Sequence, residues 1–285
     1  MDIVTIGNSQ LTVTVSPLGA EMQSLVTADG RNWLWSGDPA FWTGRSPILF
    51  PMVGRAPGDQ VSIEGNRYGM AQHGFARRSG FTLAAASETA CTFVLESNAV
   101  TREVYPFEFG LSVEHRVEGR AVVVTAEVSN RDHRPMPFGI GFHPAFAWPL
   151  PGAAGEHRVR LDNGGEPALA RLSGGLVKRE REASPFHAGE LVVRPDLFEA
   201  NAMLFPQGAG AGARYGTEET HVHLSWENLP NFALWSKPGP FLCLEPWHGT
   251  AAEVGGSDAL EERPYTEVLG PGATGRYGFR AELVG

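Results

Sequence analysis

The chain has 285 residues, of which 10% are aromatic, 35 are glycine and 21 are proline. This composition excludes a disordered chain and is typical of many short strands joined by turns. The formal net charge of −9 argues against nucleic acid and anionic membranes as main partners, because both require a basic face on the protein.

Apolar and polar residues alternate along much of the chain, which is the period of a half-buried β-strand. The clearest case is residues 107–130, where two alternating runs flank a tight turn at 118–120 and predict a β-hairpin. The same pattern predicts further strands at residues 11–16, 60–65, 81–87, 91–97, 157–161, 190–195, 220–226, 232–236, 241–247 and 276–283.

Helical patterns are weak, since residues 38–44 and 257–262 allow only one or two turns each. The glycine- and alanine-rich segments 151–157 and 206–216 are typical of mobile surface loops, with strand patterns on both sides of each. We therefore expect one all-β, antiparallel domain over residues 1–285, with very little helix and no internal repeat.

The location of the protein is indicated by what its sequence lacks. No run of about 18 apolar residues is present, so we expect no transmembrane helix. The N-terminus has no basic segment followed by a long apolar run, so we expect no signal peptide. The two cysteines, Cys91 and Cys243, lie in expected strands and are interpreted as buried, reduced thiols. A cytoplasmic location follows as the expectation.

Three short stretches carry residues that suit proton transfer. His73 lies in "AQHGFARR" and His143 in "FGIGFHPAF", while Glu245 interrupts the apolar run "FLCLEPWHG". Taken singly, each histidine is compatible with a structural role in the core. A carboxylate in an apolar strand is rarer, because burial without a partner or a task is costly.

The sequence lacks the common motifs for nucleotide cofactors, zinc hydrolysis and serine nucleophiles. We find no phosphate-binding glycine loop, no dinucleotide fingerprint, no zinc-protease motif and no serine-nucleophile elbow. His221 and His223 share one face of a strand and suit a metal, but no third ligand is evident, so a solvated strand face is the preferred interpretation. We expect no cofactor, no required metal and no set of three metal ligands.

Five motifs in a fixed order resemble one known family. They are "GAEMQSL" (19–25), "SPILFPMVGR" (46–55), "QHGFAR" (72–77), "GFHPAF" (141–146) and "ALWSKPGPFLCLEPWHG" (233–249). This series resembles the aldose 1-epimerase (galactose mutarotase-like) family, and it is most similar to the bacterial LacX-type branch. The resemblance runs from about Ile3 to Phe279 and implies a large antiparallel β-supersandwich.

The resemblance also implies roles for single residues. Glu245 matches the family's catalytic base and His143 its general acid. His73 matches the second active-site histidine, and Arg55 the arginine that binds sugar. Asn201 stands where many relatives carry an aspartate that binds sugar hydroxyls; an amide can still donate to and accept from a hydroxyl.

Two further residues are candidates for binding the substrate. Trp247 lies beside Glu245 and suits stacking on a sugar face, although packing in the core explains it equally well. Arg77, with Arg78 and Arg55, suits a phosphate group on the sugar, although a solvated loop or a salt bridge also accounts for the pair 77–78.

The chemistry of an aldose 1-epimerase needs one base and one acid, because a proton leaves O1 while another reaches the ring oxygen. The apolar run should raise the pKa of Glu245, and a nearby carboxylate should raise the pKa of His143. We expect a small sugar as the ligand and a monomer or homodimer. Two alternatives remain open: a hexose-6-phosphate mutarotase, and a non-catalytic carbohydrate-binding or sensor protein, which the asparagine at position 201 favours.

Overall fold

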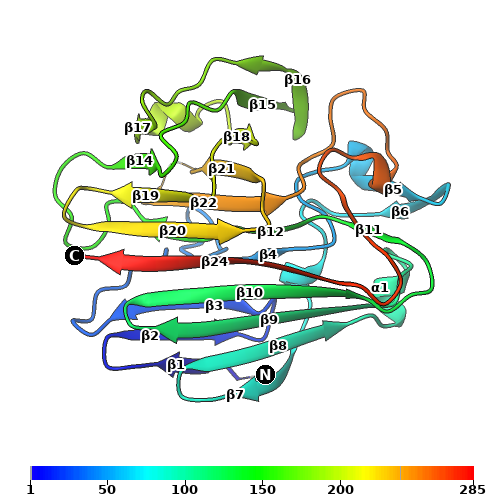
Figure 1. Ribbon diagram of the computed structural model, residues 1–285, viewed down its shortest axis with the longest axis horizontal. Helices are drawn as coiled ribbons and strands as arrows, with labels where there is room; N and C mark the ends of the chain where they lie inside the picture. The colour runs from blue at the N-terminus through cyan, green and yellow to red at the C-terminus, as the bar shows by residue number, and fades with distance from the viewer. Residues whose placement is uncertain (1, 238) are drawn as a thin grey trace.

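The computed structural model describes residues 2–237 and 239–285, and its regular secondary structure is almost entirely antiparallel β-strand (Figure 1). Its largest sheet has nine strands. In spatial order they are β17 (Glu190–Val192), β14 (Arg158–Leu161), β19 (Gly212–Gly216), β20 (His221–Glu227), β24 (Thr274–Val284), β10 (Ala121–Asn130), β9 (Phe109–Glu118), β8 (Ala90–Glu96) and β7 (Thr82–Ala86).

A second large sheet has eight strands and carries the residues of interest. Its order is β16 (Leu176–Glu182), β15 (Leu169–Ser173), β18 (Met203–Pro206), β21 (Asn231–Trp235), β22 (Phe241–His248), β12 (Ile140–Phe142) and β4 (Ile48–Leu49). The eighth strand, β13 (Ala145–Ala147), pairs with β22 beside β12.

Smaller sheets and short helices complete the fold. A three-stranded sheet joins β1 (Val4–Gly7), β2 (Leu11–Ser16) and β3 (Glu21–Thr27). Two pairs are β5 (Gln60–Ile63) with β6 (Asn66–Gly69), and β11 (Met136–Phe138) with β23 (Glu267–Leu269). The described helices are α1 (Ala99–Arg102) and the 3₁₀ turns η1 (Pro57–Asp59), η2 (Ala76–Arg78), η3 (Pro195–Phe198) and η4 (Leu260–Glu262). None of the helices in this part of the chain is long and apolar enough to cross a membrane.

The core lies between the two large sheets. The ring of Phe142 in β12 meets that of Phe279 in β24 edge to face, with centroids 5.1 Å apart. Leu242 and Leu244 of β22 belong to the same buried cluster. Because side chains alternate along a strand, Cys243, Glu245 and Trp247 point to the opposite face of the eight-stranded sheet.

The all-β prediction is confirmed, but one local prediction is wrong. Residues 206–216 do not form one long loop, because β18 extends to Pro206 and residues 212–216 form β19 inside the nine-stranded sheet. In this segment Arg214 is exposed, whereas its neighbours in sequence, Ala213 and Tyr215, are buried, which is the alternation of a strand. Residues 38–44 contain a single turn, in which the Asp38 carbonyl accepts from the N–H groups of Phe41 and Trp42, as the sequence allows. The capped helix α1 was not predicted. The single turn at η4 is confirmed.

Candidate active site

A break in one strand ladder places His143 against Glu245. On one side of the break, Gly141 of β12 pairs with Trp247; on the other, Ala145 of β13 pairs with Cys243. The register is the same on both sides, so His143 lies opposite Glu245. Pro144 has no N–H to donate to the ladder, but its carbonyl still accepts a hydrogen bond from the Leu244 N–H at 3.1 Å.

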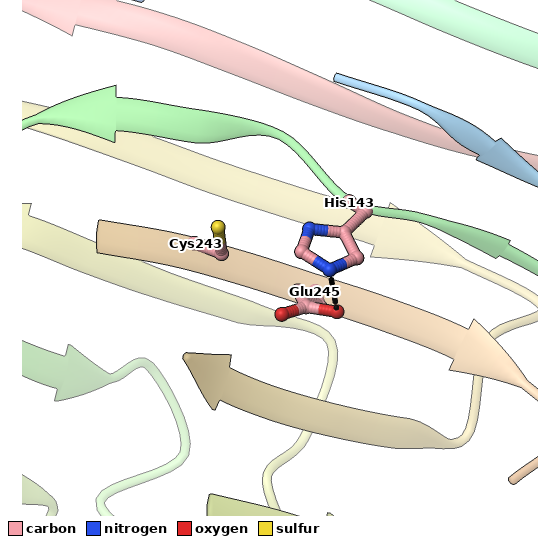
Figure 2. Close-up of side chains that lie close together, drawn as sticks. All are labelled: His143, Cys243 and Glu245. Atoms are coloured by element: carbon pink, nitrogen blue, oxygen red, sulfur yellow. Dashed lines mark ion pairs between the residues drawn. The ribbon is translucent and has the colours of Figure 1, made fainter. Parts of the chain in front are cut away.

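The two side chains meet at the broken ladder. Nε2 of His143 lies 3.1 Å from Oε2 of Glu245, and Figure 2 shows the imidazole standing over the carboxylate. Both residues are buried, with 6% and 1% of their surface exposed. A hydrogen-bonded imidazole and carboxyl group, shielded from bulk water, can take up one proton and release another.

Burial decides the charge of this pair. It raises the pKa of Glu245 well above its usual 4.5 and lowers the pKa of His143 from 6.5 to about 3. The prediction for the carboxyl group is confirmed, and the prediction that the pKa of His143 is raised is wrong. The desolvation penalty of the imidazolium exceeds its electrostatic attraction to the neighbouring carboxylate, because burial also disfavours the ionised form of that carboxyl group.

His73 approaches the pair from a tight turn. Its backbone has a φ of +65°, and its ring centroid lies 5.8 Å from that of His143. The Gly54 N–H donates to Nδ1 at 3.0 Å, so in the neutral ring Nε2 carries the proton. Burial also holds the pKa of His73 well below 6.5. His73 is therefore neutral, and its Nε2 lies 3.2 Å from the side-chain amide of Gln72.

A cavity of about 540 Å³ opens above these three residues. All seven residues singled out from the sequence line it, so the structure brings together side chains from five separate stretches of chain. These residues are Arg55, His73, Arg77, His143, Asn201, Glu245 and Trp247. Arg78 does not line this cavity.

The two arginines differ in their surroundings. Arg55 forms a two-pronged ion pair with Asp59, at 2.8 and 2.9 Å, so most of its charge is already compensated. Arg77 donates to the Gln72 carbonyl at 3.0 Å. Burial and the charge of Arg78 lower the pKa of Arg77, and Glu21 acts weakly in the other direction.

Asn201 and Trp247 both line the cavity, and each has a polar N–H group without a hydrogen-bond partner in the part of the chain that the structure describes. Asn201 has a φ of +73°, a conformation that asparagine tolerates well, and its Oδ1 accepts from the Ala202 N–H at 2.8 Å. Its amide NH₂ remains available to a ligand. Trp247 is 5% exposed, and its Nε1 has no hydrogen-bond partner among the residues that the structure describes.

Comparison with known proteins agrees with this geometry. The family model described as aldose 1-epimerase matches residues 2–194. The chain belongs to the aldose 1-epimerase family. It is 28% identical to the protein LacX (chromosomal) of Lactococcus lactis subsp. lactis, over 93% of this chain and 94% of that protein.

Solved structures of similar proteins share the whole fold. A galactose mutarotase related enzyme from Lactobacillus acidophilus superimposes with a TM-score of 0.93 at 26% identity, covering 100% of this chain and 98% of the other. A galactose mutarotase-like protein from Lactobacillus casei gives a TM-score of 0.90 at 29% identity, covering 99% and 100%. Family and fold together support an isomerase that acts on a small-molecule sugar.

Several residues that line the cavity were not found from the sequence. Trp42 and Trp235 line the cavity, and their ring centroids lie 4.9 and 5.8 Å from that of His143. Lys237 also lines the cavity. Trp235 and Lys237 lie inside a motif that carried the resemblance, but nothing in the spacing of Trp42 indicates that its loop folds over the site.

Three potential metal ligands lie close together in the candidate site. Donor atoms of His143, Cys243 and Glu245 all lie within 4.8 Å of one another, so the expectation that no three potential ligands meet is wrong. By contrast, His223 pairs with Asp162 at 2.7 Å on the nine-stranded sheet, and His221 joins no group of three within residues 2–237 and 239–285. Cys243 and Glu245 are two positions apart, and the histidine comes from a distant strand.

Proposed function

We propose that this protein is an aldose 1-epimerase, a mutarotase that interconverts the α and β anomers of a free hexose or related aldose. The observation that carries the proposal is the buried pair of His143 and Glu245 on the floor of a cavity of about 540 Å³. A pocket of this size accommodates a single sugar ring.

The reaction requires two proton transfers. Glu245 takes the proton from the O1 hydroxyl while His143 delivers a proton to the ring oxygen, and the C1–O5 bond breaks to give the open-chain aldehyde. Rotation about the C1–C2 bond turns the other face of the carbonyl towards O5. The same transfers in reverse close the ring as the other anomer, so the reaction consumes no proton overall.

The shared proton of the pair suits this cycle. Ring opening converts ionised Glu245 and protonated His143 into the neutral acid and neutral imidazole. Burial favours this neutral arrangement in the empty site, so the protein stabilises the state that accompanies the open chain. Both arrangements hold the same number of protons and interconvert along the 3.1 Å contact.

The remaining residues orient the sugar. His73 offers its Nε2–H to the ring oxygen or a neighbouring hydroxyl, and the amide of Asn201 and the remaining N–H groups of Arg55 serve further hydroxyls. Trp247 and Trp42 provide apolar surface for the faces of the ring. The two cysteines are free and buried, which supports a reduced, cytoplasmic setting for the enzyme.

A mutarotation assay tests this proposal. Freshly dissolved α-anomers of several aldoses should reach anomeric equilibrium faster with the protein than without it, as followed by polarimetry or NMR. The Glu245→Gln variant serves as the control for catalysis by contaminants. Binding of a sugar with no acceleration by the wild-type protein would contradict the enzyme proposal and favour a sugar-binding or sensor protein.

A phosphorylated sugar is the second candidate substrate, because Arg77 and Lys237 line the cavity and neither forms an ion pair among the residues described. We favour the free sugar, since Arg55 is neutralised by Asp59. Comparing Arg77→Ala with Arg78→Ala separates the two cases, because Arg78 lies outside the cavity. Selective loss of turnover of hexose 6-phosphates in Arg77→Ala alone would favour the phosphorylated substrate.

A further inference from the structure

The thiol of Cys243 lies close to His143 and Glu245. Cys243 lies two residues before Glu245 on the same face of β22, and its Sγ, a carboxylate oxygen of Glu245 and a ring nitrogen of His143 are mutually within 4.8 Å (Figure 2). Nothing in the proposed epimerase reaction uses this thiol. All three residues are buried, so the cluster is not a chance grouping of surface acids.

The donor set fits a zinc ion. Zinc binds sulfur at about 2.3 Å and nitrogen or oxygen at about 2.0–2.2 Å, and tetrahedral geometry then separates the donor atoms by roughly 3.2–3.8 Å. His143 and Glu245 already lie 3.1 Å apart. The three donor atoms lie within 4.8 Å of one another, so side-chain movements of about 1 Å would bring them to this spacing. The fourth position faces the cavity, because His143 and Glu245 line it.

The net charge of a zinc complex with these ligands also suits a buried site. A divalent cation with one thiolate, one carboxylate and one neutral imidazole forms a complex with no net charge, which avoids the cost of burying an isolated ion. The ion replaces the proton on the thiol and the proton on the carboxyl group, and both protons pass to solvent.

We propose that His143, Cys243 and Glu245 form an inhibitory zinc site, in which the ion occupies the position of the proton that the acid and base share. The metal-binding part rests only on the geometry of the cluster. The inhibitory part rests on the proposed function, because zinc would engage both residues that move protons during epimerisation.

Cobalt binding tests the site without any reference to activity. Co²⁺ bound to a thiolate gives a charge-transfer absorption in the near ultraviolet. We expect this band in the wild-type protein and in Cys91→Ala, which removes the other buried free thiol, in β8. Cys243→Ala should lose the band. Its affinity for Zn²⁺, measured by competition with a chromophoric chelator, should fall by more than about tenfold, as for loss of groups that support a metal site. Cys243→Ser serves as a second variant if the alanine variant is unfolded.

Activity then tests inhibition. Zn²⁺ should suppress mutarotation by the wild type and Cys91→Ala, a chelator should restore it, and Cys243→Ala should remain active. A cobalt band that depends on Cys243 in a protein without mutarotase activity would leave the metal site standing and refute the proposed function. Equal zinc affinity in the wild type and in a folded Cys243 variant, or the absence of a thiolate band, would overturn the metal site.

Discussion

Glu245 and His143 hold one transferable proton between them. Burial opposes a negative charge on the carboxyl group and a positive charge on the imidazole, so the neutral acid and neutral base form the resting state. A second proton enters the pair only in strong acid, and the shared proton leaves only above the usual range of a carboxyl group. The two side chains therefore titrate as one unit.

Replacing Glu245 by glutamine should remove the base while preserving the shape of the side chain. We expect the rate of mutarotation to fall by about 10²–10⁴-fold, the usual contribution of a positioned proton-transfer group. Sugar affinity and the unfolding temperature should change little. His143→Asn should act similarly, and the double variant should lose much less than the product of the two single losses. NMR exchange rates at saturating sugar measure this; retention of more than about a tenth of the rate in Glu245→Gln would contradict the assignment.

The pH dependence of kcat/KM should be a broad bell. Its limbs are the reverse of the usual assignment, in which a carboxyl group gives the acidic limb and a histidine gives the basic limb. The acidic limb should report protonation of His143, whose pKa is about 3, and the basic limb should report loss of the proton from Glu245. The rate should therefore not fall as the pH drops from 7 to about 5, where an ordinary histidine gains its proton. Stopped-flow polarimetry over this range measures the profile. An acidic limb centred above pH 6 would show that burial does not control the pair.

At the scale of elements, alternation predicted many of the longer strands, but the seven-residue strands β3 and β16 were missed. The hairpin of β9 and β10 follows the alternation of its apolar residues. The short strands β12 and β13 were missed, because three residues are too few to show a period. Yet these two strands carry the register that sets His143 against Glu245. The residues of the pair were found by resemblance, whereas their direct contact is a property of strand pairing that no local pattern contains.

The turn that holds His73 depends on a second element, the loop after β4. Arg263, which is buried without a carboxylate partner among the residues described, donates to the carbonyls of Val53 at 3.0 Å and Thr250 at 2.8 Å. Burial lowers the pKa of Arg263 to about 10. Its hydrogen bonds join Val53, which precedes Gly54, to Thr250, which precedes Ala251, and so hold the segment whose Gly54 N–H donates to His73.

Gly54→Ala should disturb this turn. Its φ is +70°, and an added methyl group would lie 2.5 Å from the backbone of Ala251. We expect a loss of unfolding free energy from left-handed strain of about 1–2 kcal/mol and from overpacking of about 1–3 kcal/mol, together with a raised KM as His73 moves. Gly58→Ala is the matched control, because its φ is +59° and nothing lies within 4 Å of the added group. Urea unfolding should show only the strain for the control; equal losses in the two variants would contradict the argument.

At the scale of the whole molecule, His115 connects two sheets. Its Nε2–H in β9 donates to the carbonyl of Ala20, which precedes β3, at 2.9 Å. Burial lowers the pKa of His115 from 6.5 to about 4. The unfolded chain therefore binds one more proton than the folded protein between these two pH values, so the free energy of unfolding falls as the pH drops from 6.5 to 4 and is unaffected by this residue above that window.

His115→Gln should flatten this acid dependence. A single group contributes at most about 1.4 kcal/mol per pH unit, so the difference in unfolding free energy between pH 7 and pH 5 should shrink by up to about 2 kcal/mol in the variant. Urea titrations at the two pH values measure the difference, which does not depend on any stability lost equally at both. The exposed His187→Gln serves as control and should leave the slope unchanged. An unchanged slope in His115→Gln would show that the residue is not held neutral.

The cavity is also a property of the whole molecule. Ordered motifs identified seven of its lining residues, because each motif contains a residue type with an evident task. Trp42 and the thiol of Cys243 were not assigned to the site, because an aromatic loop residue and a buried cysteine resemble core residues in any sequence. Only the path of the chain brings them to His143.

The last strand of the chain lies in the middle of the largest sheet. Figure 1 shows β24 in red between β20 and β10, and its pairing with both runs almost to the C-terminus. During synthesis, the hairpin of β9 and β10 can form early, but it cannot join β20 until β24 has left the ribosome. Completion of the sheet, and with it the wall behind Phe142, therefore waits for the synthesis of β24. A chain shortened by its last dozen residues would hold two unjoined half-sheets with exposed edges, the form in which such proteins associate wrongly with one another.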